Sequence, residues 1–330
     1  MDLEDIGFYS LEDDRAKQVS MYSPLWRCEL LVTSQCNFRC LYCRGLQTEK
    51  PELSFDDARR VIDIWGGQGL RNVRFSGGEP TTWPHLLRLV EHTVSACHDI
   101  KHIAISTNGY ADYSYYQDLI GAGVNDLSIS LDACCASTGD MMSGGIPGSW
   151  ERVCDNTQKL SELTYVTAGV VLTQDTIGDL VDIIYFAHSL GVADIRIISS
   201  AQWNDPAAWN NVHIDSVVLD AHPILKYRFG NFKNGRNVRG IRANDCHKCW
   251  LMLDDMAVKD DKHYPCIIKL REGCTPVGKI DGAVRENRYK YILEHDTYID
   301  SICRKNCLDV CIDYNNKVNS YVAKATGTFV

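Results

Sequence analysis

The sequence lacks an apolar run long enough to cross a bilayer and lacks the pattern of a secretory leader. A membrane-spanning helix needs about 18 or more apolar residues in a row, and no such run occurs. The first 14 residues carry six acidic side chains before the first basic one, Arg15, whereas a signal peptide begins with positive charge. These absences predict a cytoplasmic protein without a membrane anchor.

A surplus of basic residues is also missing. Lys and Arg number 34 against 43 Asp and Glu, which gives a formal net charge of −9. Non-specific nucleic-acid binding needs clustered Lys and Arg, so the balance predicts no nucleic-acid partner and suits a neutral or cationic ligand better. Internal repeats of about 20 to 50 residues and low-complexity tracts are absent as well, which excludes a solenoid or a disordered array.

Cysteine, by contrast, is abundant. The 330 residues are 45% hydrophobic and 23% charged, an ordinary composition for a globular protein with a sizeable core, but 15 of them are Cys. In a reducing compartment, clustered cysteines more often hold metal or carry out redox chemistry than form disulfides.

Hydrophobic periodicity indicates an α/β fold. The expected strands are Cys28–Thr33, Asn72–Ser76, His102–Ser106, Asp126–Leu131, Thr164–Leu172 and Asp194–Ser199. The expected helices are Ser54–Gln68, Pro84–Cys97, Tyr113–Ala122, Ser149–Leu163 and Ile177–Leu190, with Ser54 and Asp179 as caps. Six strand–helix units fall short of the eight of a closed barrel, so we expect a partial (β/α)6 barrel with functional residues at the carboxyl ends of its strands.

The composition changes along the chain and suggests four segments. Residues 1–26 are an N-terminal extension, and residues 27–200 form the barrel. Residues 201–242 are rich in Asn, Trp, Pro and charge, and we expect a connector with little regular structure. Residues 243–330 form a small cysteine-rich domain.

The strongest motif directly follows the first expected strand and reads Cys36-Asn-Phe-Arg-Cys40-Leu-Tyr-Cys43. Three thiolates on one short loop can bind three corners of a [4Fe-4S] cubane and leave the fourth iron open to a second molecule. A zinc site is the alternative, but it would need a fourth Cys or His, and none follows within the loop.

This motif resembles that of the radical SAM superfamily, which has Cys-x3-Cys-x2-Cys after the first strand and an aromatic residue, here Tyr42, before the third Cys. The resemblance extends over roughly residues 27 to 200. Gly77-Gly78-Glu79-Pro80 resembles the family's glycine-rich loop, whose backbone holds the methionine amino group of S-adenosylmethionine (SAM). A backbone without Cβ can approach the ligand closely.

The ends of later strands resemble further cosubstrate positions of the family. These are Ser106 and Asn108 after the third strand, Ser130 after the fourth and Ile198 in the sixth. Polar residues at such places can instead simply cap strands. In the family, the cluster reduces SAM to methionine and a 5′-deoxyadenosyl radical, which removes a hydrogen atom from a C–H bond; the protein positions the groups and excludes water.

The C-terminal cysteines resemble the auxiliary-cluster domain of twitch or SPASM type, which implies a second [4Fe-4S] cluster. The expected ligands are Cys246, Cys266, Cys303 and Cys307, with Cys311 as an alternate. Cys303, Cys307 and Cys311 are spaced to share one face of a helix or turn. A structural zinc site with four cysteine ligands is the alternative.

More cysteines are present than one cluster needs, so a spare thiol can return a hydrogen atom to a carbon radical. The candidate is Cys249, with Trp250 beside it as a wall of the substrate pocket. Cys249 can equally be a ligand paired with Cys246 in a Cys-x2-Cys unit. We expect the barrel residue Asp132 to contact the substrate.

The whole arrangement resembles the radical SAM epimerases of aminoglycoside biosynthesis, of the type that converts neomycin C to neomycin B. The resemblance implies a small cationic aminosugar substrate, an external electron donor of flavodoxin or ferredoxin type, and Cys249 as hydrogen donor. The ammonium groups would meet acidic residues. Candidates for these are Glu79, Asp132, Asp205, Asp254 and Asp255. The alternatives are a radical SAM dehydrogenase or peptide-modifying oxidoreductase that passes an electron to the auxiliary cluster, and a non-catalytic iron–sulfur or zinc protein.

Overall fold

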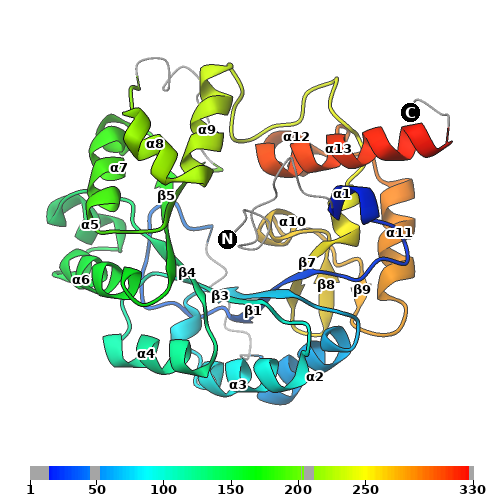
Figure 1. Ribbon diagram of the computed structural model, residues 1–330, viewed down its shortest axis with the longest axis horizontal. Coiled ribbons are helices and arrows are strands. Elements are labelled where there is room, and N and C mark those ends of the chain that lie inside the picture. The colour runs from blue at the N-terminus through cyan, green and yellow to red at the C-terminus, as the bar shows by residue number, and fades with distance from the viewer. Residues whose placement is uncertain (1–14, 45–52, 202, 204–211, 327–330) are drawn as a thin grey trace.

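A nine-stranded sheet organises the chain in the computed structural model, which describes residues 15–44, 53–201, 203 and 212–326. The strand order is β6-β5-β4-β3-β2-β1-β7-β8-β9 (Figure 1). The strands are β1 (Arg27–Thr33), β2 (Asn72–Gly77), β3 (His102–Thr107), β4 (Asp126–Ser130), β5 (Tyr165–Leu172), β6 (Asp194–Ser199), β7 (Asp255–Lys259), β8 (Lys262–Tyr264) and β9 (Gly278–Lys279).

The first six strands are parallel and alternate with helices, as the periodicity predicts. The helices of this part are α1 (Arg15–Gln18), α2 (Phe55–Gly66), α3 (Leu86–Ala96), α4 (Tyr113–Ala122), α5 (Ala136–Met142), α6 (Ser149–Ser161) and α7 (Leu180–Ser189), with 3-10 turns η1 (Pro80–Thr82) and η2 (Ile177–Asp179). Figure 1 shows α2, α3, α4, α6 and α7 along the outer face of the curved sheet. The expected partial barrel is therefore confirmed.

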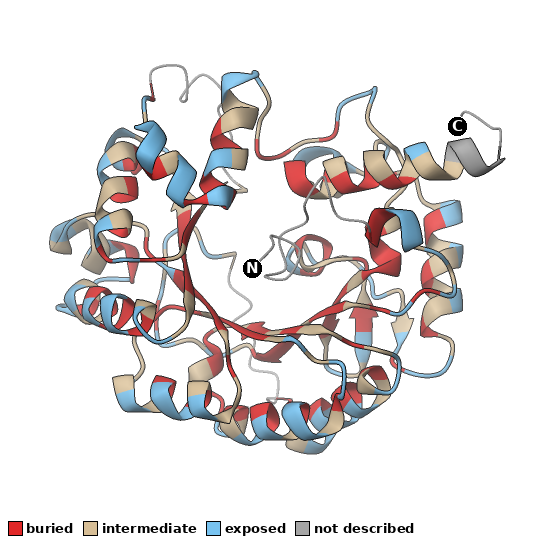
Figure 2. Cartoon of the chain, in the orientation of Figure 1, coloured by how far each residue is buried: buried red, intermediate tan, exposed pale blue. Residues whose placement is uncertain are grey.

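Burial explains why these strands form the centre of the molecule. Leu30, Phe75, Ile105 and Leu127 are fully buried, so β1 to β4 each place apolar side chains under the helices (Figure 2). Helix α2 begins where the sequence predicts, because the Ser54 hydroxyl accepts a hydrogen bond from the Asp57 amide at 3.1 Å. Asp179 precedes α7 in the capping position, but its side chain makes no capping hydrogen bond.

The second half of the chain adds α8 (Ser216–Ala221), α9 (Pro223–Lys233), η4 (Trp250–Leu253), α10 (Ile267–Arg271), α11 (Val284–Glu294), α12 (Ser301–Asn306) and α13 (Asp309–Thr326). The expectation of little regular structure between 201 and 242 is therefore wrong for α8 and α9. Pro223 starts α9, and Ile224, Leu225 and Phe229 are buried at helical spacing, a period hidden by the polar residues around them.

The cysteine-rich segment continues the barrel sheet. Strand β7 pairs in parallel with β1, with Arg27 opposite Asp255 and Leu31 opposite Lys259. Strands β8 and β9 then extend the sheet antiparallel. Just before β7, the fully buried Asp254 forms ion pairs with Arg15 and Arg27, the latter at 2.8 Å. The sheet therefore crosses the boundary expected near residue 243.

Within the described ranges, no helix is both long and apolar enough to span a membrane.

Candidate functional site

A cavity of about 650 Å³ opens at the carboxyl ends of the parallel strands. The expected cluster thiols Cys36, Cys40 and Cys43 line it, and so does Asp132. All eight residues predicted to contact SAM line it as well: Tyr42, Gly77, Gly78, Glu79, Ser106, Asn108, Ser130 and Ile198. The structure therefore brings together, around one cavity, residues taken from five stretches of the sequence.

The loop after β1 holds its thiols in a compact turn. The Cys43 amide donates to the Cys40 carbonyl at 3.0 Å, and the Phe38 amide lies 3.4 Å from the Cys36 sulfur. Burial raises the pKa of the Cys40 thiol to about 12, so without metal this thiol is protonated and binding a cluster displaces its proton. Backbone N–H groups directed at sulfur favour thiolate ligands. The donor set thus fits an iron–sulfur cluster.

Gly77 and Gly78 are required because the backbone at the end of β2 closely approaches the backbone at the start of the cysteine loop. Gly77 has φ of 150°, and a Cβ on it would lie 2.2 Å from the Thr33 carbonyl oxygen. A Cβ on Gly78 would lie 2.0 Å from the Gln35 carbonyl oxygen. The Gly78 amide donates to Thr33 and the Glu79 amide donates to Gln35, at 2.9 and 2.8 Å. The glycines therefore seat the end of β2 against the start of the cysteine loop.

Glu79 is buried and its carboxylate is occupied by the protein itself. One oxygen accepts from the Thr81 hydroxyl at 2.6 Å and from the Thr107 hydroxyl at 2.7 Å, and the other accepts from the Asn108 amide at 2.7 Å. Burial raises the pKa of Glu79 and these hydrogen bonds oppose the rise. Glu79 thus ties the end of β2 to the end of β3, a positioning role that the motif alone does not reveal.

Tyr42 and Asp132 connect the cysteine loop to the opposite side of the barrel. The Tyr42 hydroxyl donates to Asp132 at 2.5 Å, and the Val171 amide donates to the other oxygen of Asp132 at 2.6 Å. Burial raises the pKa of Asp132 to about 6. Asn108 adds a second connection, because its side-chain amide donates to Asn37 in the loop at 2.7 Å.

The charges of five C-terminal thiols act on one another although four different elements or loops carry them. Burial raises the pKa of Cys303 and Cys307, and the charges of Cys249 and Cys266 raise both further. Burial raises the pKa of Cys311 as well, and the charges of Cys266 and Cys249 raise it further. The expected helical face is broken, since Cys303 lies in α12, Cys307 ends that helix, and Cys311 lies in α13.

The surroundings of Cys246 and Cys249 bear on the roles expected for them, which stay predictions. The charge of Cys249 acts on Cys266, Cys303, Cys307 and Cys311, whereas the charges that act most on the Cys246 thiol are those of Lys248 and Asp245, and its sulfur contacts Lys248. Neither Cys249 nor Trp250 is among the described residues that line the cavity, and Trp250 packs in apolar clusters with Leu251. Cys249 and Trp250 lie close in the sequence to the expected ligand Cys246, but closeness in the sequence does not determine which way the loop turns. Cys311 does line the cavity.

The spacing of the sulfurs bears on which metal they fit. The thiolates of a tetrahedral zinc site lie roughly 3.8 Å apart. Among the described residues, no three cysteines bring their sulfurs within 4.8 Å of one another. The group that does meet this limit is His295, Asp300 and Cys303, where Asp300 already pairs with Lys269 at 2.5 Å. As described, the cysteine sulfurs are therefore not close enough for a zinc ion held by three or more thiolates.

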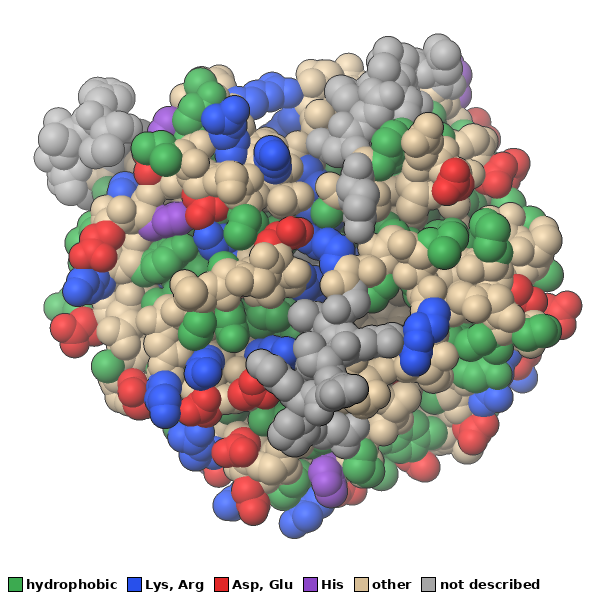
Figure 3. Space-filling model, turned by 180° about the vertical axis from the view of Figure 1, so that it is seen from behind, with side chains coloured by type: hydrophobic (Ala, Val, Ile, Leu, Met, Phe, Trp, Pro, Cys, Tyr) green, Lys and Arg blue, Asp and Glu red, His purple; other side chains and the backbone are tan. Residues whose placement is uncertain are grey.

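Arginines are the feature of the site that the sequence reasoning missed. Among the described residues, seven arginines line the cavity: Arg39, Arg44, Arg74, Arg196, Arg228, Arg239 and Arg271. Figure 3, a view from behind, shows Lys and Arg side chains inside the hollow at the centre of that face. Arg196 precedes Ile198 by two residues on β6, so strand alternation places both side chains on one face of the sheet. This spacing is a sequence signal that Arg196 lines the cavity with Ile198.

Comparison with known proteins agrees with this geometry. A model of the radical SAM superfamily matches residues 30–187. The GTP 3′,8-cyclase of Mannheimia succiniciproducens is 38% identical over 109 residues, 32% of each chain. The molybdenum cofactor biosynthesis protein 1 of Drosophila melanogaster is 29% identical over 218 residues, 62% of this chain and 37% of that one. The chain thus spans about a third of the length of the curated relatives it matches.

Solved structures show the same fold at low identity. Native anSMEcpe with bound AdoMet aligns with a TM-score of 0.59 at 14% identity, covering 91% of this chain and 97% of that chain. Streptococcus suis SuiB bound to S-adenosylmethionine aligns with a TM-score of 0.55 at 14% identity, covering 77% and 63%. The match to the radical SAM superfamily model, residues 30–187, runs from β1 into α7 of this fold.

Proposed function

We propose that this protein is a radical SAM enzyme whose cosubstrate binds in the cavity beside Cys36, Cys40 and Cys43. The observation that carries the proposal is the meeting of this three-thiol loop with all eight predicted cosubstrate residues around one cavity. A [4Fe-4S] cluster held by the three thiols, together with SAM, supplies a 5′-deoxyadenosyl radical when both are bound.

The chain's own contribution is to position these groups. Gly77 and Gly78 allow β2 to approach the cysteine loop, Glu79 fixes β2 to β3, and the Tyr42–Asp132 hydrogen bond holds the loop against the far wall. These contacts come from separate strands, so the sheet fixes their relative positions. Such preorganisation is what a reaction through a reactive radical requires.

We propose further that the reaction is an epimerisation, in which a thiol returns hydrogen to the substrate carbon from the opposite face. The support is the excess of one convergent thiol over the four that a cubane takes. Of the five, Cys311 lines the cavity whereas Cys249 does not, so Cys311 replaces Cys249 as the candidate donor. The thiyl radical formed on the donor is reduced back by one electron and one proton, the electron coming from an external flavodoxin- or ferredoxin-type donor.

The alternative outcome is oxidation, with the substrate electron passed to the auxiliary cluster. The same convergent C-terminal thiols support it, because they would hold that acceptor. The identity to GTP 3′,8-cyclases covers only about a third of the chain and does not carry their substrate over.

The resemblance to aminoglycoside epimerases implies a cationic substrate. The acidic residues expected to bind it support this only in part. Asp254 is fully buried between two arginines, Glu79 is hydrogen-bonded internally, and Asp205 lies outside the described residues. Asp132 and Asp255 do line the cavity.

The test is cleavage of SAM by the anaerobically reconstituted protein with dithionite. We expect 5′-deoxyadenosine and methionine by mass spectrometry, none from Cys40→Ala, and unchanged amounts from Cys135→Ala, which removes an exposed thiol outside both cysteine sets. Product formation by Cys40→Ala would refute the proposal. With neomycin C as probe in heavy water, deuterium at an inverted carbon supports epimerisation, and a product two electrons poorer supports the alternative.

A further inference from the structure

Arginines from several elements crowd together in the cavity. Arg74 lies on β2, Arg196 on β6 and Arg228 on α9; Arg239 follows α9, Arg44 follows the cysteine loop, and Arg271 ends α10. All six line the cavity. Arg228 and Arg239 are 1% and 8% exposed, so their charges are largely removed from bulk water.

These positive charges act on one another. Burial lowers the pKa of Arg196 to about 10, the charges of Arg74 and Arg228 lower it further, and the carboxylates Glu29 and Asp126 oppose the change. Burial likewise lowers the pKa of Arg239 to about 10, with further lowering by Arg44 and Arg228. Like charges held together in a poorly solvated place destabilise the protein unless negative charge balances them.

Part of the balancing negative charge lies behind the arginines, and part of it, the Glu29 carboxylate that acts on Arg196, lines the cavity with them. Arg74 pairs with Asp126 at 3.0 Å, and Arg228 pairs with Asp309 at 2.9 Å. Neither aspartate is among the described residues that line the cavity. The far sides of these guanidinium groups are therefore neutralised while the groups still border the cavity.

Arg196 and Arg239 donate hydrogen bonds to neutral oxygen atoms. The Arg196 guanidinium donates to the Ser128 hydroxyl at 3.0 Å, and its Nε is buried without a hydrogen-bond partner among the described residues. Arg239 donates to two neutral carbonyl oxygens, those of Ser199 at 2.8 Å and Asn306 at 3.1 Å. Arg196 thus lines the cavity and has one buried donor, its Nε, that is not used within the described residues.

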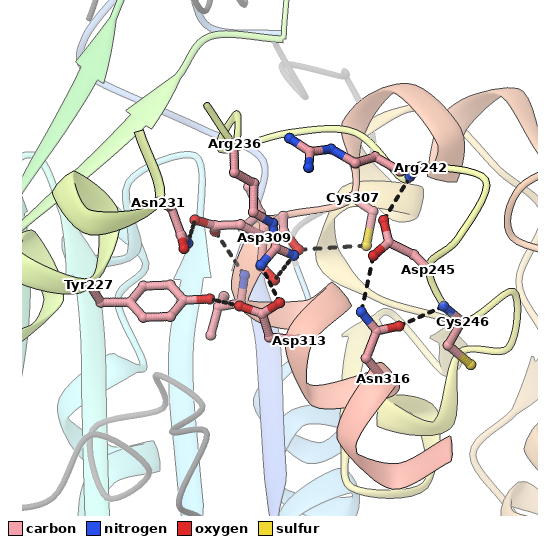
Figure 4. Close-up of polar contacts among 12 residues, drawn as sticks. Tyr227, Asn231, Arg236, Arg242, Asp245, Cys246, Cys307, Asp309, Asp313 and Asn316 are labelled. Atoms are coloured by element: carbon pink, nitrogen blue, oxygen red, sulfur yellow. Dashed lines mark hydrogen bonds and ion pairs between the residues drawn. The ribbon is translucent and has the colours of Figure 1, made fainter. Parts of the chain in front are cut away.

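Helix α9, which carries Arg228, is clamped to α13. The Asn231 side chain donates to Asp309 at 2.7 Å, and Asp313 accepts from both Tyr227 and Arg236 (Figure 4). Asp309 contacts Arg228 and Asn231 at once, so the arginine is held in place before any ligand arrives. Preformed donors reduce the entropy cost of binding.

We propose that Arg196, Arg228 and Arg239 form a subsite for a phosphate group of the substrate. The inference rests on the proposed function in one respect, namely that the cavity receives the substrate. Planar guanidinium groups match the oxygens of phosphate with paired hydrogen bonds, and the charge of a phosphate balances several of them. The substrate class is then a phosphorylated or nucleotide-linked sugar, in place of a bare polycation.

The SAM carboxylate is a second source of the same oxyanion chemistry, so the experiment separates the two. Inorganic pyrophosphate is titrated by calorimetry into the anaerobically reconstituted holoenzyme, with and without saturating SAM, and SAM itself is titrated separately. The variants are Arg196→Gln, Arg271→Gln at the exposed end of α10, and the control Arg59→Gln on the exposed face of α2. Urea unfolding shows whether each variant is folded.

We expect wild type to bind pyrophosphate also when SAM is present, with affinity about tenfold weaker in Arg196→Gln, less reduced in Arg271→Gln and unchanged in Arg59→Gln. Absence of pyrophosphate binding by wild type, or equal binding by all variants, overturns the inference. So does loss of SAM affinity in Arg196→Gln together with displacement of pyrophosphate by SAM. Formation of 5′-deoxyadenosine is measured in the same samples, and its absence from wild type counts against the proposed function alone.

Discussion

The two sets of cysteines are assembled in opposite ways. Cys36, Cys40 and Cys43 lie within eight consecutive residues of one loop at the rim of the cavity. The C-terminal set combines Cys249, before η4, and Cys266, before α10, with thiols on and after α12. The first set is brought together by its closeness in the sequence. The second set forms only after the β7–β8 hairpin and the helices α12 and α13 have packed against each other.

That difference explains what each region demands of the rest of the protein. The loop thiols need a neighbouring backbone, and Gly77 and Gly78 provide it without side chains. The C-terminal thiols need tertiary packing, and the Arg288 guanidinium provides part of it by donating to the carbonyls of Met252, Tyr264 and Asp255. We therefore expect the cysteine loop to tolerate substitutions in distant parts of the protein, and the C-terminal cysteine set to be disrupted by them.

The largest expected effect is a difference in iron content between variants of Cys249 and Cys246, two cysteines three residues apart. Replacing Cys249 by Ala removes one of the four proposed cluster ligands and leaves Cys266, Cys303 and Cys307, so we expect iron in the reconstituted protein to fall from about eight to about four atoms per chain. Cys246→Ala is the matched control and keeps the full content. Iron is measured by colorimetric assay. The opposite result would mean that Cys249 is the free thiol and that the C-terminal set was misassigned.

A smaller effect tests the backbone contact under the cysteine loop. Gly78→Ala drives a Cβ against the Gln35 carbonyl, and we expect the free energy of unfolding in urea to fall by about 3 kcal/mol. Gly178→Ala, where no atom lies within 4 Å of the added carbon, is the control and changes little. If both variants are equally stable, β2 and the loop do not meet as described.

The smallest effect concerns Cys135, which belongs to neither set and is exposed. The hydroxyls of Ser137 and Thr138 lie 3.4 Å from its sulfur and lower its pKa to about 7, whereas burial raises the pKa of Cys154 to about 12. Only the thiolate reacts with iodoacetamide, so alkylation of Cys135 rises as the pH is raised through about 7. Cys154 stays unmodified over that range. Peptide mass spectrometry follows both, and a Cys135 rate that rises only near pH 9 would exclude the lowered pKa.

Much of the barrel and of the cysteine loop was predictable because the signals are local. Strand alternation and the spacing of Cys36, Cys40 and Cys43 can be read along a few residues. Helix α9 was missed because its short apolar face is interrupted by charged side chains. The role of Glu79, the position of Cys311 and the arginine group were not predictable, since each depends on contacts between residues tens to hundreds of positions apart.

The pairing of β7 with β1 has a consequence for synthesis of the chain. One edge of β1 is completed by β2 early, but the other stays open until Asp255–Lys259 has left the ribosome, more than two hundred residues after β1 itself. An unsatisfied strand edge next to a hydrophobic core is a template for aggregation. The growing polypeptide therefore exposes an unpaired, aggregation-prone edge of β1 during most of its translation. Slow elongation before residue 255 should lower the soluble yield.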